Sequence, residues 1–297
     1  MSDKILCVGE ILWDALPEGL FLGGAPFNVA CHLQALGQEV ACGSRVGDDR
    51  LGQEALRRMR ARGLSTDLVQ VDHSRPTGFV QVDLEAPEEP SYEILKPAAW
   101  DAITLTDSLQ RHAEQADALV YGSLAQRALP SRGTIERLCA ADLLRVFDVN
   151  LRPPFVDRTV VTRSLEAADV VKCNADELRQ LQDWFDVPAT TEDALGTLAA
   201  TFECSCVCVT AGHDGAGLWM DGDVSRHSGY AVDVDDPVGA GDAFLAALLA
   251  GLLGGWSGTD LLGLANRLGA YVAARPGALP AHSADTVAGI SALCLSP

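Results

Sequence analysis

The sequence predicts an α/β protein, a three-layer α/β/α sandwich around a mostly parallel sheet with a small β lid inserted in it. Two observations predict the sandwich: short apolar strands alternate with helical segments, and each strand ends in polar residues or glycine. A third predicts the lid, because residues 77–94 alternate between apolar and polar side chains around a Pro/Glu-rich turn. No internal repeat or Ser/Gly linker divides the chain, so we expect a single domain over 1–297.

The composition indicates a folded protein and argues against two classes of partner. A hydrophobic content of 48% is enough for a sizeable core. Lys and Arg total 22 against 41 Asp and Glu, and the net charge of −19 argues against nucleic acid or an anionic membrane as the main partner. The N-terminus lacks the basic start of a signal peptide, and no apolar run reaches membrane-spanning length, so we expect a cytoplasmic protein.

The nine cysteines are scattered through apparent core segments without a Cys-x-x-Cys pair, which predicts reduced, buried thiols. Cys204, Cys206 and Cys208 could be taken for a metal site. Their period-two spacing instead favours one face of a strand, where the three thiols would pack in the core.

The first expected strand covers residues 4–9, and residues 10–14 continue it, with the carboxylate of Asp14 just past its carboxyl end. Open α/β sheets bind ligands at that end. No Gly-x-Gly-x-x-Gly follows this strand, and the three lysines of the chain leave no Gly-Lys-Ser/Thr phosphate loop. The sequence therefore argues against a dinucleotide site and a P-loop.

Two adjacent glycines, Gly23 and Gly24, precede a helix expected over 29–36, which Gly37 closes as a left-handed C-cap. Glycines at this point would let a ligand touch the backbone. Asn28 on the first turn could offer a donor and an acceptor to a polyol, or it could simply cap the helix.

A strand over 39–46 and an amphipathic helix over 51–62 complete the first part of the sandwich. We expect the lid to be formed by about 75–100 together with about 12–23. Such a lid could cover the ligand end of the sheet and exclude water, which matters where hydrolysis competes with group transfer. The alternative is an edge hairpin without a function.

Strands and helices alternate again in the second half, with strands expected over 117–122, 145–150, 169–174 and 206–210. Because the carboxyl ends of parallel strands meet at one edge, the polar residues that end these strands should gather at a single rim, as in an active site. The rim residues are Asp148, Asn150, Arg152, Asn174, Glu177, Thr210 and Gly212.

The motif at residues 236–242, Asp-Pro-Val-Gly-Ala-Gly-Asp, precedes a helix over 243–253 that is apolar on most sides. Gly239 and Gly241 would leave bare backbone N–H groups at the positive end of that helix, a seat for an anion. A carboxylate beside a bound phosphate is understandable if Asp242 takes a proton from a hydroxyl that attacks phosphorus. Alternatively, Asp242 only caps the helix and the glycines only form a turn.

Asn174 and Glu177 stand three residues apart at the start of a predicted helix. This spacing would place an amide and a carboxylate on one face for a hydrated Mg²⁺. It is also the spacing of a capping box, and the local sequence supports both interpretations equally.

Six motifs occur in a characteristic order, at residues 9–14, 22–28, 148–152, 174–177, 210–215 and 236–242. Together they resemble the PfkB-type, ribokinase-like sugar kinases, and most of all the bacterial fructokinases. The resemblance covers nearly the whole chain and implies a ribokinase-like fold with a Rossmann-like, mostly parallel sheet. It implies an ATP-dependent kinase that phosphorylates a primary hydroxyl of a small sugar, D-fructose to fructose 6-phosphate, with Mg²⁺.

The resemblance also assigns roles to single residues. Asp242 is implied as the catalytic base, with Gly239, Ala240 and Gly241 as the anion hole. The implied sugar contacts are Asp14, Gly23, Gly24, Asn28, Arg152 and Asp242. The implied nucleotide contacts are Asn174, Thr210, Gly212, Gly215, Gly241 and, near the adenine, Asn266. Asn174 and Glu177 are implied as the magnesium-side pair, acting through water.

A potassium loop would draw on Asp236, Val238 and Gly277. Pro237 and Val238 stand where family members often carry two threonines, which weakens the potassium inference without touching the catalytic Asp242. With three lysines in the chain, compensation of triphosphate charge must come from Mg²⁺, helix-end amides and Arg152.

The fold leaves other substrates open, namely 2-keto-3-deoxygluconate, ribose, another ketose or a nucleoside, because fold analogy cannot choose among them. A sugar- or nucleotide-binding regulator without turnover is the alternative from a different class, and the intact Asp242 argues against it. The expected partners are the small-molecule sugar and ATP. The lid is also a candidate surface for a homodimer.

Overall fold

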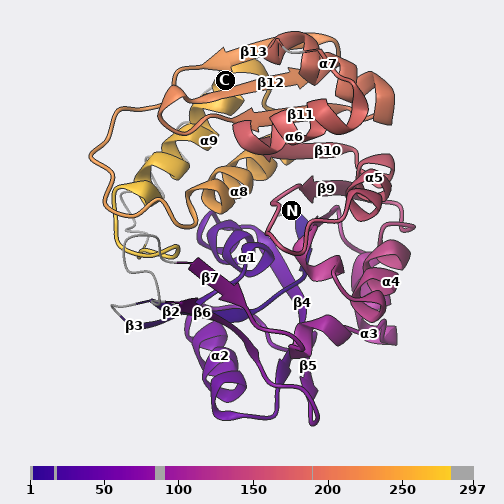
Figure 1. The fold of residues 1–297 in the computed structure, drawn as a ribbon, viewed down its shortest axis with the longest axis vertical. Helices are drawn as coiled ribbons and strands as arrows, with labels where there is room; N and C mark the ends of the chain where they lie inside the picture. Colours follow the sequence, from indigo (N-terminus) through magenta and orange to yellow (C-terminus); the bar gives the residue numbers. More distant parts are fainter. Residues whose placement is uncertain (1–2, 17–18, 84–90, 189, 282–297) are drawn as a thin grey trace.

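The computed structural model describes residues 3–16, 19–83, 91–188 and 190–281. A nine-stranded sheet runs through its centre in the order β13-β12-β11-β10-β9-β8-β1-β4-β5 (Figure 1). Its strands are β1 (Lys4–Val8), β4 (Glu39–Gly47), β5 (Val69–Asp72), β8 (Ala118–Gly122), β9 (Leu144–Asp148), β10 (Val170–Asn174), β11 (Cys206–Thr210), β12 (Ala216–Met220) and β13 (Asp223–His227). The strands from β11 to β5 in this order are parallel, as predicted. β12 and β13 add an antiparallel hairpin at one edge.

Helices cover both faces of this sheet and complete the predicted three layers (Figure 1). On one face lie α1 (Ala25–Ala35), α2 (Arg50–Ala61), α8 (Ala240–Leu253) and α9 (Gly258–Ala273). On the other face lie α3 (Asp107–Ala113), α4 (Leu129–Leu138), α5 (Arg158–Ala167), α6 (Ala175–Phe185) and α7 (Thr191–Phe202). Three 3₁₀ turns, η1 (Ala99–Ala102), η2 (Leu124–Gln126) and η3 (Gly212–Asp214), lie in the connections.

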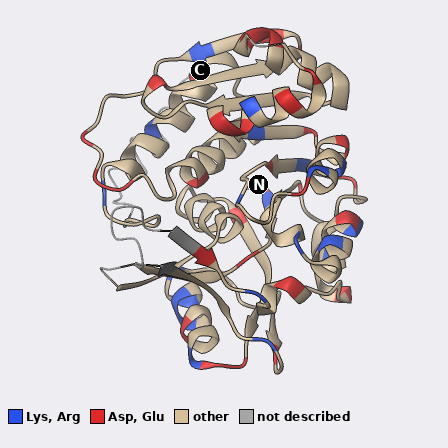
Figure 2. Cartoon of the chain, viewed as in Figure 1, with Lys and Arg blue, Asp and Glu red and all other residues tan. Residues whose placement is uncertain are grey.

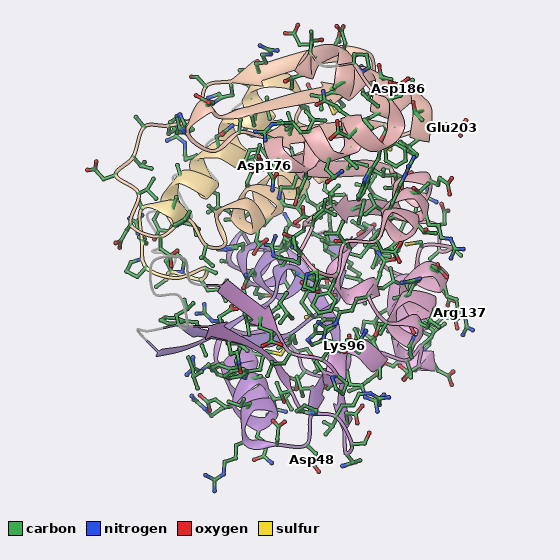
Figure 3. All side chains as sticks on the ribbon, viewed as in Figure 1. Asp48, Lys96, Arg137, Asp176, Asp186 and Glu203 are labelled. Atoms are coloured by element: carbon green, nitrogen blue, oxygen red, sulfur yellow. The ribbon has the colours of Figure 1, made fainter. Side chains whose placement is uncertain are left out.

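Apolar residues lie inside the molecule and most charged residues lie on its outside, as the sequence patterns predict. Helix α8 packs between α1 and α9, and all residues from Ala243 to Leu249 are buried, so its apolar circumference is enclosed. Figure 2 shows most charged residues on the outer helices and loops. Asp48, Arg137 and Glu203, for example, are exposed and project from the outside of the molecule (Figure 3). In the described part of the chain, no helix combines the length and apolarity needed to span a membrane.

A separate four-stranded sheet stands beside the main one, in the order β3-β2-β6-β7 (Figure 1). Its strands are β2 (Leu12–Leu16), β3 (Gly19–Gly23), β6 (Gly78–Asp83) and β7 (Ser91–Ile94). β6 and β7 form the predicted hairpin, with Val80 opposite Ile94. The Pro/Glu-rich turn between them lies outside the described residues.

Three local expectations were wrong. Residues 10–14 do not continue β1, because the chain leaves the main sheet after Val8 and pairs again as β2 of the small sheet. Helix α1 begins at Ala25 rather than at 29, since a proline at 26 fits the first helical turn. Cys204 precedes β11 and packs on the opposite face of the sheet from Cys206 and Cys208, because the strand begins only at Cys206.

Candidate active site

A cleft of about 2120 Å³ opens between the carboxyl ends of the central strands and the small sheet. It collects nearly every site residue that the sequence indicated. These residues are Asp14, Gly23, Gly24, Asn28, Arg152, Asn174, Thr210, Gly212, Gly215, Asp236, Val238, Gly239, Ala240, Gly241, Asp242, Asn266 and Gly277. Glu177 is 5% exposed and stands behind the cleft wall.

Asp242 is held by a side chain from another helix. Its Oδ2 accepts a hydrogen bond of 2.8 Å from Nδ2 of Asn28 on α1. Burial, and next the charge of Asp148, raise the pKa of Asp242 to about 6. The hydrogen bond from Asn28 and the positive charges of Lys172 and Arg152 act in the opposite direction. At neutral pH the carboxylate is therefore mostly ionised, yet basic enough to take up a proton.

The start of α8 does not use Asp242 as a cap, so the capping interpretation is wrong. The N-cap is Gly239, whose φ of 77° lies in the left-handed region, and Asp242 is the third residue after it. A Cβ on Gly239 would come within 2.5 Å of Ala278, which leaves room for glycine alone. The N–H of Ala240 donates to the carbonyl of Pro237 at 3.3 Å, and the next amides of this turn have no acceptor within the helix. Ala240 and Gly241 line the cleft, where the positive end of α8 would suit an anion, and we call this turn the anion seat.

Asp14, Gly23 and Asn28 lie together in the cleft, and Asn28 connects this group to Asp242. A Cβ on Gly23 would lie 2.9 Å from Oδ2 of Asp14 and 3.9 Å from Oδ1 of Asn28. Asn28 does not cap α1, whose N-cap is Gly24. Its Oδ1 is buried and finds no hydrogen-bond partner among the described residues. Burial raises the pKa of Asp14 to about 6, against the charge of Arg152. These acceptors suit a ligand that carries several hydroxyl groups.

Lys172 is a site residue that the sequence did not indicate. It is the third residue of β10, 5% exposed, and its Nζ donates to Oδ1 of Asp148 at 3.1 Å. Burial lowers its pKa, but Asp148, Glu177 and Asp242 outweigh burial and raise the pKa above the usual value of a lysine. A Cβ on Gly241 would lie 3.2 Å from Nζ, so this cation borders the anion seat. The available signal was a lysine inside an apolar strand.

Asn174 and Glu177 form the capping box at the start of α6. Oδ1 of Asn174 accepts from the N–H of Glu177, and Oε2 of Glu177 accepts from the N–H of Asn174, both at 2.8 Å. Oε1 of Glu177 accepts from the N–H of Leu151, also at 2.8 Å. Burial, then Asp148, raise the pKa of Glu177, against Lys172. The carboxylate of Glu177 thus has a structural role. Oδ2 of Asp148 is buried and has no hydrogen-bond partner in the part of the chain that the structure describes, and carboxylate oxygens such as these are the ligands that Mg²⁺ prefers.

The start of α8 and the small sheet form two walls of the cleft, and the end of β11, η3 and α9 form its third wall. Thr210 ends β11, Gly212 begins η3 and Gly215 follows it, and the two glycines have positive φ of 58° and 83°. Any Cβ on Gly215 would clash with the backbone of His227 on β13. Asn266 on α9 is 8% exposed and donates through Nδ2 to the carbonyl of Leu262 at 2.8 Å.

Asp236 closes the loop in front of α8. Its Oδ1 accepts from the N–H of Val238 and its Oδ2 from the N–H of Gly277, both at 2.9 Å. The carboxylate thus joins two segments of the proposed potassium loop.

Arg152 also lines the cleft, where it is exposed and donates to the carbonyl of its neighbour Leu151.

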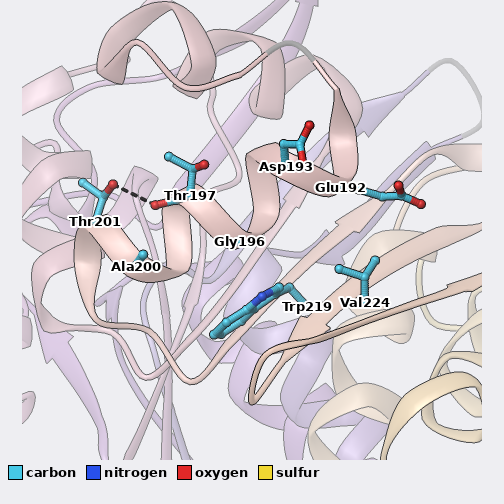
Figure 4. A pocket seen from close by; sticks show the side chains of 8 residues that line it. All are labelled: Glu192, Asp193, Gly196, Thr197, Ala200, Thr201, Trp219 and Val224. Carbon is cyan, nitrogen blue, oxygen red and sulfur yellow. Dashed lines mark hydrogen bonds between the residues drawn. The ribbon is translucent and has the colours of Figure 1, made fainter.

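A smaller hollow of about 490 Å³ lies between α7 and the β12–β13 hairpin (Figure 4). Gly196 and Thr197 line it beside the ring of Trp219. Its carboxylate Glu192 pairs with Arg226 at 3.0 Å. The hollow contains none of the residues that the sequence indicated for a site.

The chain is similar to known proteins over most of its length. The model of the pfkB family carbohydrate kinases matches residues 18–284. A fructokinase from Escherichia coli is 31% identical over 303 residues, which cover 95% of this chain and 96% of that protein. The structure of a fructokinase from Vibrio cholerae O395 in fructose, ADP and calcium ion bound form is 25% identical, has a TM-score of 0.81, and covers 98% of this chain and 99% of that chain.

A second solved structure shows the breadth of the fold. The aminoimidazole riboside kinase from Salmonella enterica, complexed with aminoimidazole riboside and an ATP analog, has a TM-score of 0.80. It covers 98% of this chain and 100% of that chain, at 22% identity. The likeness at this identity concerns the fold alone.

Proposed function

Since the chain belongs to the pfkB family of carbohydrate kinases, we propose that it transfers the γ-phosphoryl group of ATP to a primary hydroxyl of D-fructose, with Asp242 as the general base. The observation that carries this proposal is the 2.8 Å hydrogen bond between Asn28 and Asp242. It joins a carboxylate at the anion seat of α8 to the polar group of the sugar end of the cleft. The product would be fructose 6-phosphate.

Phosphoryl transfer would proceed with one proton acceptor and one leaving group. The sugar hydroxyl gives its proton to Asp242 while its oxygen forms a bond to the γ-phosphorus. The bond between that phosphorus and the bridging oxygen breaks, and its electron pair leaves on ADP. A base with a pKa of about 6 is mostly free to accept this proton at neutral pH.

The negative charge of the transferred group would be met by the amides of Gly239 to Gly241 and by Lys172, which borders them. Magnesium, when bound, neutralises phosphate charge, and Asn174 and Glu177 would hold it through water. The nucleotide would lie along the third wall of the cleft, against Thr210, Gly212, Gly215 and Asn266.

We also propose that the small sheet is a lid over the sugar and a contact surface between two copies of the chain. Leu20 and Phe21 on its edge strand β3 are 46% and 37% exposed, which is costly for apolar side chains in water. Light scattering on the wild type and on Leu20→Glu tests the contact. A dimer that Leu20→Glu converts to a monomer supports it, and a monomeric wild type contradicts it.

Fructose is proposed as the sugar because the E. coli relative that spans nearly the whole chain is a fructokinase, and because residues 22–28 resemble that group. ADP release over a panel of ketoses, aldoses, nucleosides and 2-keto-3-deoxygluconate, with Mg²⁺ and with or without potassium, tests it. Fructose should give the highest kcat/KM. If another acceptor exceeds fructose by about tenfold, a difference of about 1.4 kcal/mol, the sugar assignment is wrong while the kinase assignment stands.

A further inference from the structure

Glu10 is a buried carboxyl group in the wall of the active-site cleft, and none of the roles above uses it. It follows β1 and Gly9 and is 2% exposed. Its Oε1 accepts a hydrogen bond of 3.2 Å from the backbone N–H of Ala25, the first residue of α1. Its Oε2 is buried and has no hydrogen-bond partner in the described part of the chain.

Glu10 replaces the missing cap of α1. The N-cap residue is Gly24, which has no side chain to satisfy the N–H groups of the first turn. Gly24 also touches Glu10, since a Cβ on it would clash with the Glu10 carbonyl and lie 3.3 Å from Cγ. A carboxylate beside the first amides of a helix is favourable because the helix dipole is positive there. Glu10 therefore holds the start of α1 from outside the helix.

The turn that Glu10 holds also carries Asn28. The N–H of Asn28 donates to the carbonyl of Gly24 at 2.8 Å, so the place of Asn28 depends on this turn. From there Nδ2 of Asn28 reaches Asp242 at 2.8 Å. We propose that Glu10 is a positioning residue for phosphoryl transfer, which fixes the first turn of α1 and, through Asn28, the carboxylate of Asp242. This inference rests on the proposed function, in which Asp242 is the base.

The effect of Glu10 on the first turn of α1, and through it on Asp242, should depend on pH. Burial raises the pKa of Glu10 to about 7, and Asp242 adds to the rise, while backbone N–H groups and Arg152 act against it. The neighbouring β4 contributes the thiol of Cys42, and the first turn of α1, residues 25–28, contributes no titratable side chain. Above about pH 7 Glu10 is charged, and a charge-assisted bond to the amide of α1 is stronger than a neutral one.

A double-mutant cycle tests whether Glu10 acts through Asn28. Glu10→Ala should lower kcat about tenfold, and should raise the sugar Kd measured by calorimetry by a smaller factor. In an Asn28→Ala background the same substitution should cost less than about twofold, because the link to Asp242 is already broken. Equal losses in both backgrounds would overturn the proposal.

Glu10→Gln provides a second readout that a purely structural role would not change. Its amide oxygen still accepts from Ala25 but carries no charge. Its kcat should match the wild type at about pH 6 and fall about fivefold below it at about pH 8. Parallel pH profiles would refute the positioning role, and this test holds even if Glu10→Ala does not fold.

A matched control separates capping from positioning. Asp157 caps α5 on the other side of the sheet, where it accepts from the N–H of Thr159 at 2.9 Å. Asp157→Ala should lower Tm and leave kcat unchanged. A Glu10→Ala variant that behaves in the same way would contradict the proposal. The proposed function fails by a different result, namely Asp242→Asn retaining wild-type turnover.

Discussion

Replacing Asp242 by Asn should slow catalysis strongly and change sugar binding little. Asn keeps the shape of the side chain and an oxygen that can accept the hydrogen bond from Asn28, but it cannot take up a proton. General-base assistance is worth ~10² to 10⁴ in rate, so kcat should fall by at least the lower figure. The fructose Kd should change by no more than a few-fold, because Asp14, Gly23 and Asn28 remain in place.

The same variant should be more stable than the wild type at neutral pH. The pKa of Asp242 is about 6 in the folded protein against an ordinary 3.8, so the folded state binds this proton more tightly. The resulting stabilisation is complete below about pH 4 and is lost as pH rises through 6. A rise of about two pKa units corresponds to a cost of ~3 kcal/mol for the charged form in the folded state, which is an upper limit. Because Asp242 is partly exposed to the cleft, solvent screening lowers the expected cost, to ~1 kcal/mol at the least.

Two measurements follow from these magnitudes. Calorimetric melting should place Asp242→Asn several degrees above the wild type at about pH 8 and close to it at about pH 4. ADP release at saturating fructose gives kcat. Asp260→Asn is the matched control, because Asp260 occupies the corresponding third position of α9, is exposed, and should change neither quantity. A variant that keeps about half of wild-type kcat would refute the role of Asp242 as base, and a lower Tm at neutral pH would refute the burial argument.

Three further variants test the surroundings of Asp242. Lys172→Met should lower Tm, since breaking a buried ion pair costs ~3–5 kcal/mol. Because Lys172 lowers the pKa of Asp242, its loss should also move the rising limb of the kcat/KM profile above about pH 6. Adding Asp148→Asn should restore Tm but not kcat, and full recovery of kcat would contradict a role of Lys172 in transfer. Glu177→Gln should raise the Mg²⁺ concentration needed for activity. It should also lower the free energy of unfolding by ~1–2 kcal/mol in melting experiments, because one backbone N–H loses its acceptor. An unchanged Mg²⁺ dependence would leave Glu177 with the capping role alone. Gly239→Ala should reduce Tm and kcat together, because a positive φ costs an L-residue ~1–2 kcal/mol; an active variant of normal Tm would argue against the anion seat.

Periodicity predicted the elements whose burial is simple. Strand β11 has the predicted bounds, and the apolar run of α8 is enclosed as its composition required. The β12–β13 hairpin was missed although it carried a signal, since Asp221-Gly222 stands between two short strands and both residues have positive φ. The first turn of α8 was missed because Ala240 and Gly241 are weak markers of a helix start.

The site was harder to predict because its chemistry depends on contacts between distant segments. Lys172 is paired with a carboxylate 24 residues earlier in the chain, and no local pattern reveals that pair. For Asn174 and Glu177, by contrast, a local pattern was present but did not decide between two roles. A capping box and a metal-side pair use the same spacing, so only the hydrogen bonds to Leu151 and within α6 reveal that the box is formed.

Three carboxyl groups of the cleft work against the stability of the protein in its empty form. Burial raises the pKa of Glu10 to about 7 and those of Asp14 and Asp242 to about 6. Each group therefore favours the folded state while protonated and loses that contribution as pH rises through these values. Glu10 also accepts a hydrogen bond from the start of α1, but apolar side chains at positions 14 and 242 would avoid the cost of burying a charge. Such clustering of perturbed acids is typical of sites where proton transfer, rather than folding, has determined the residues.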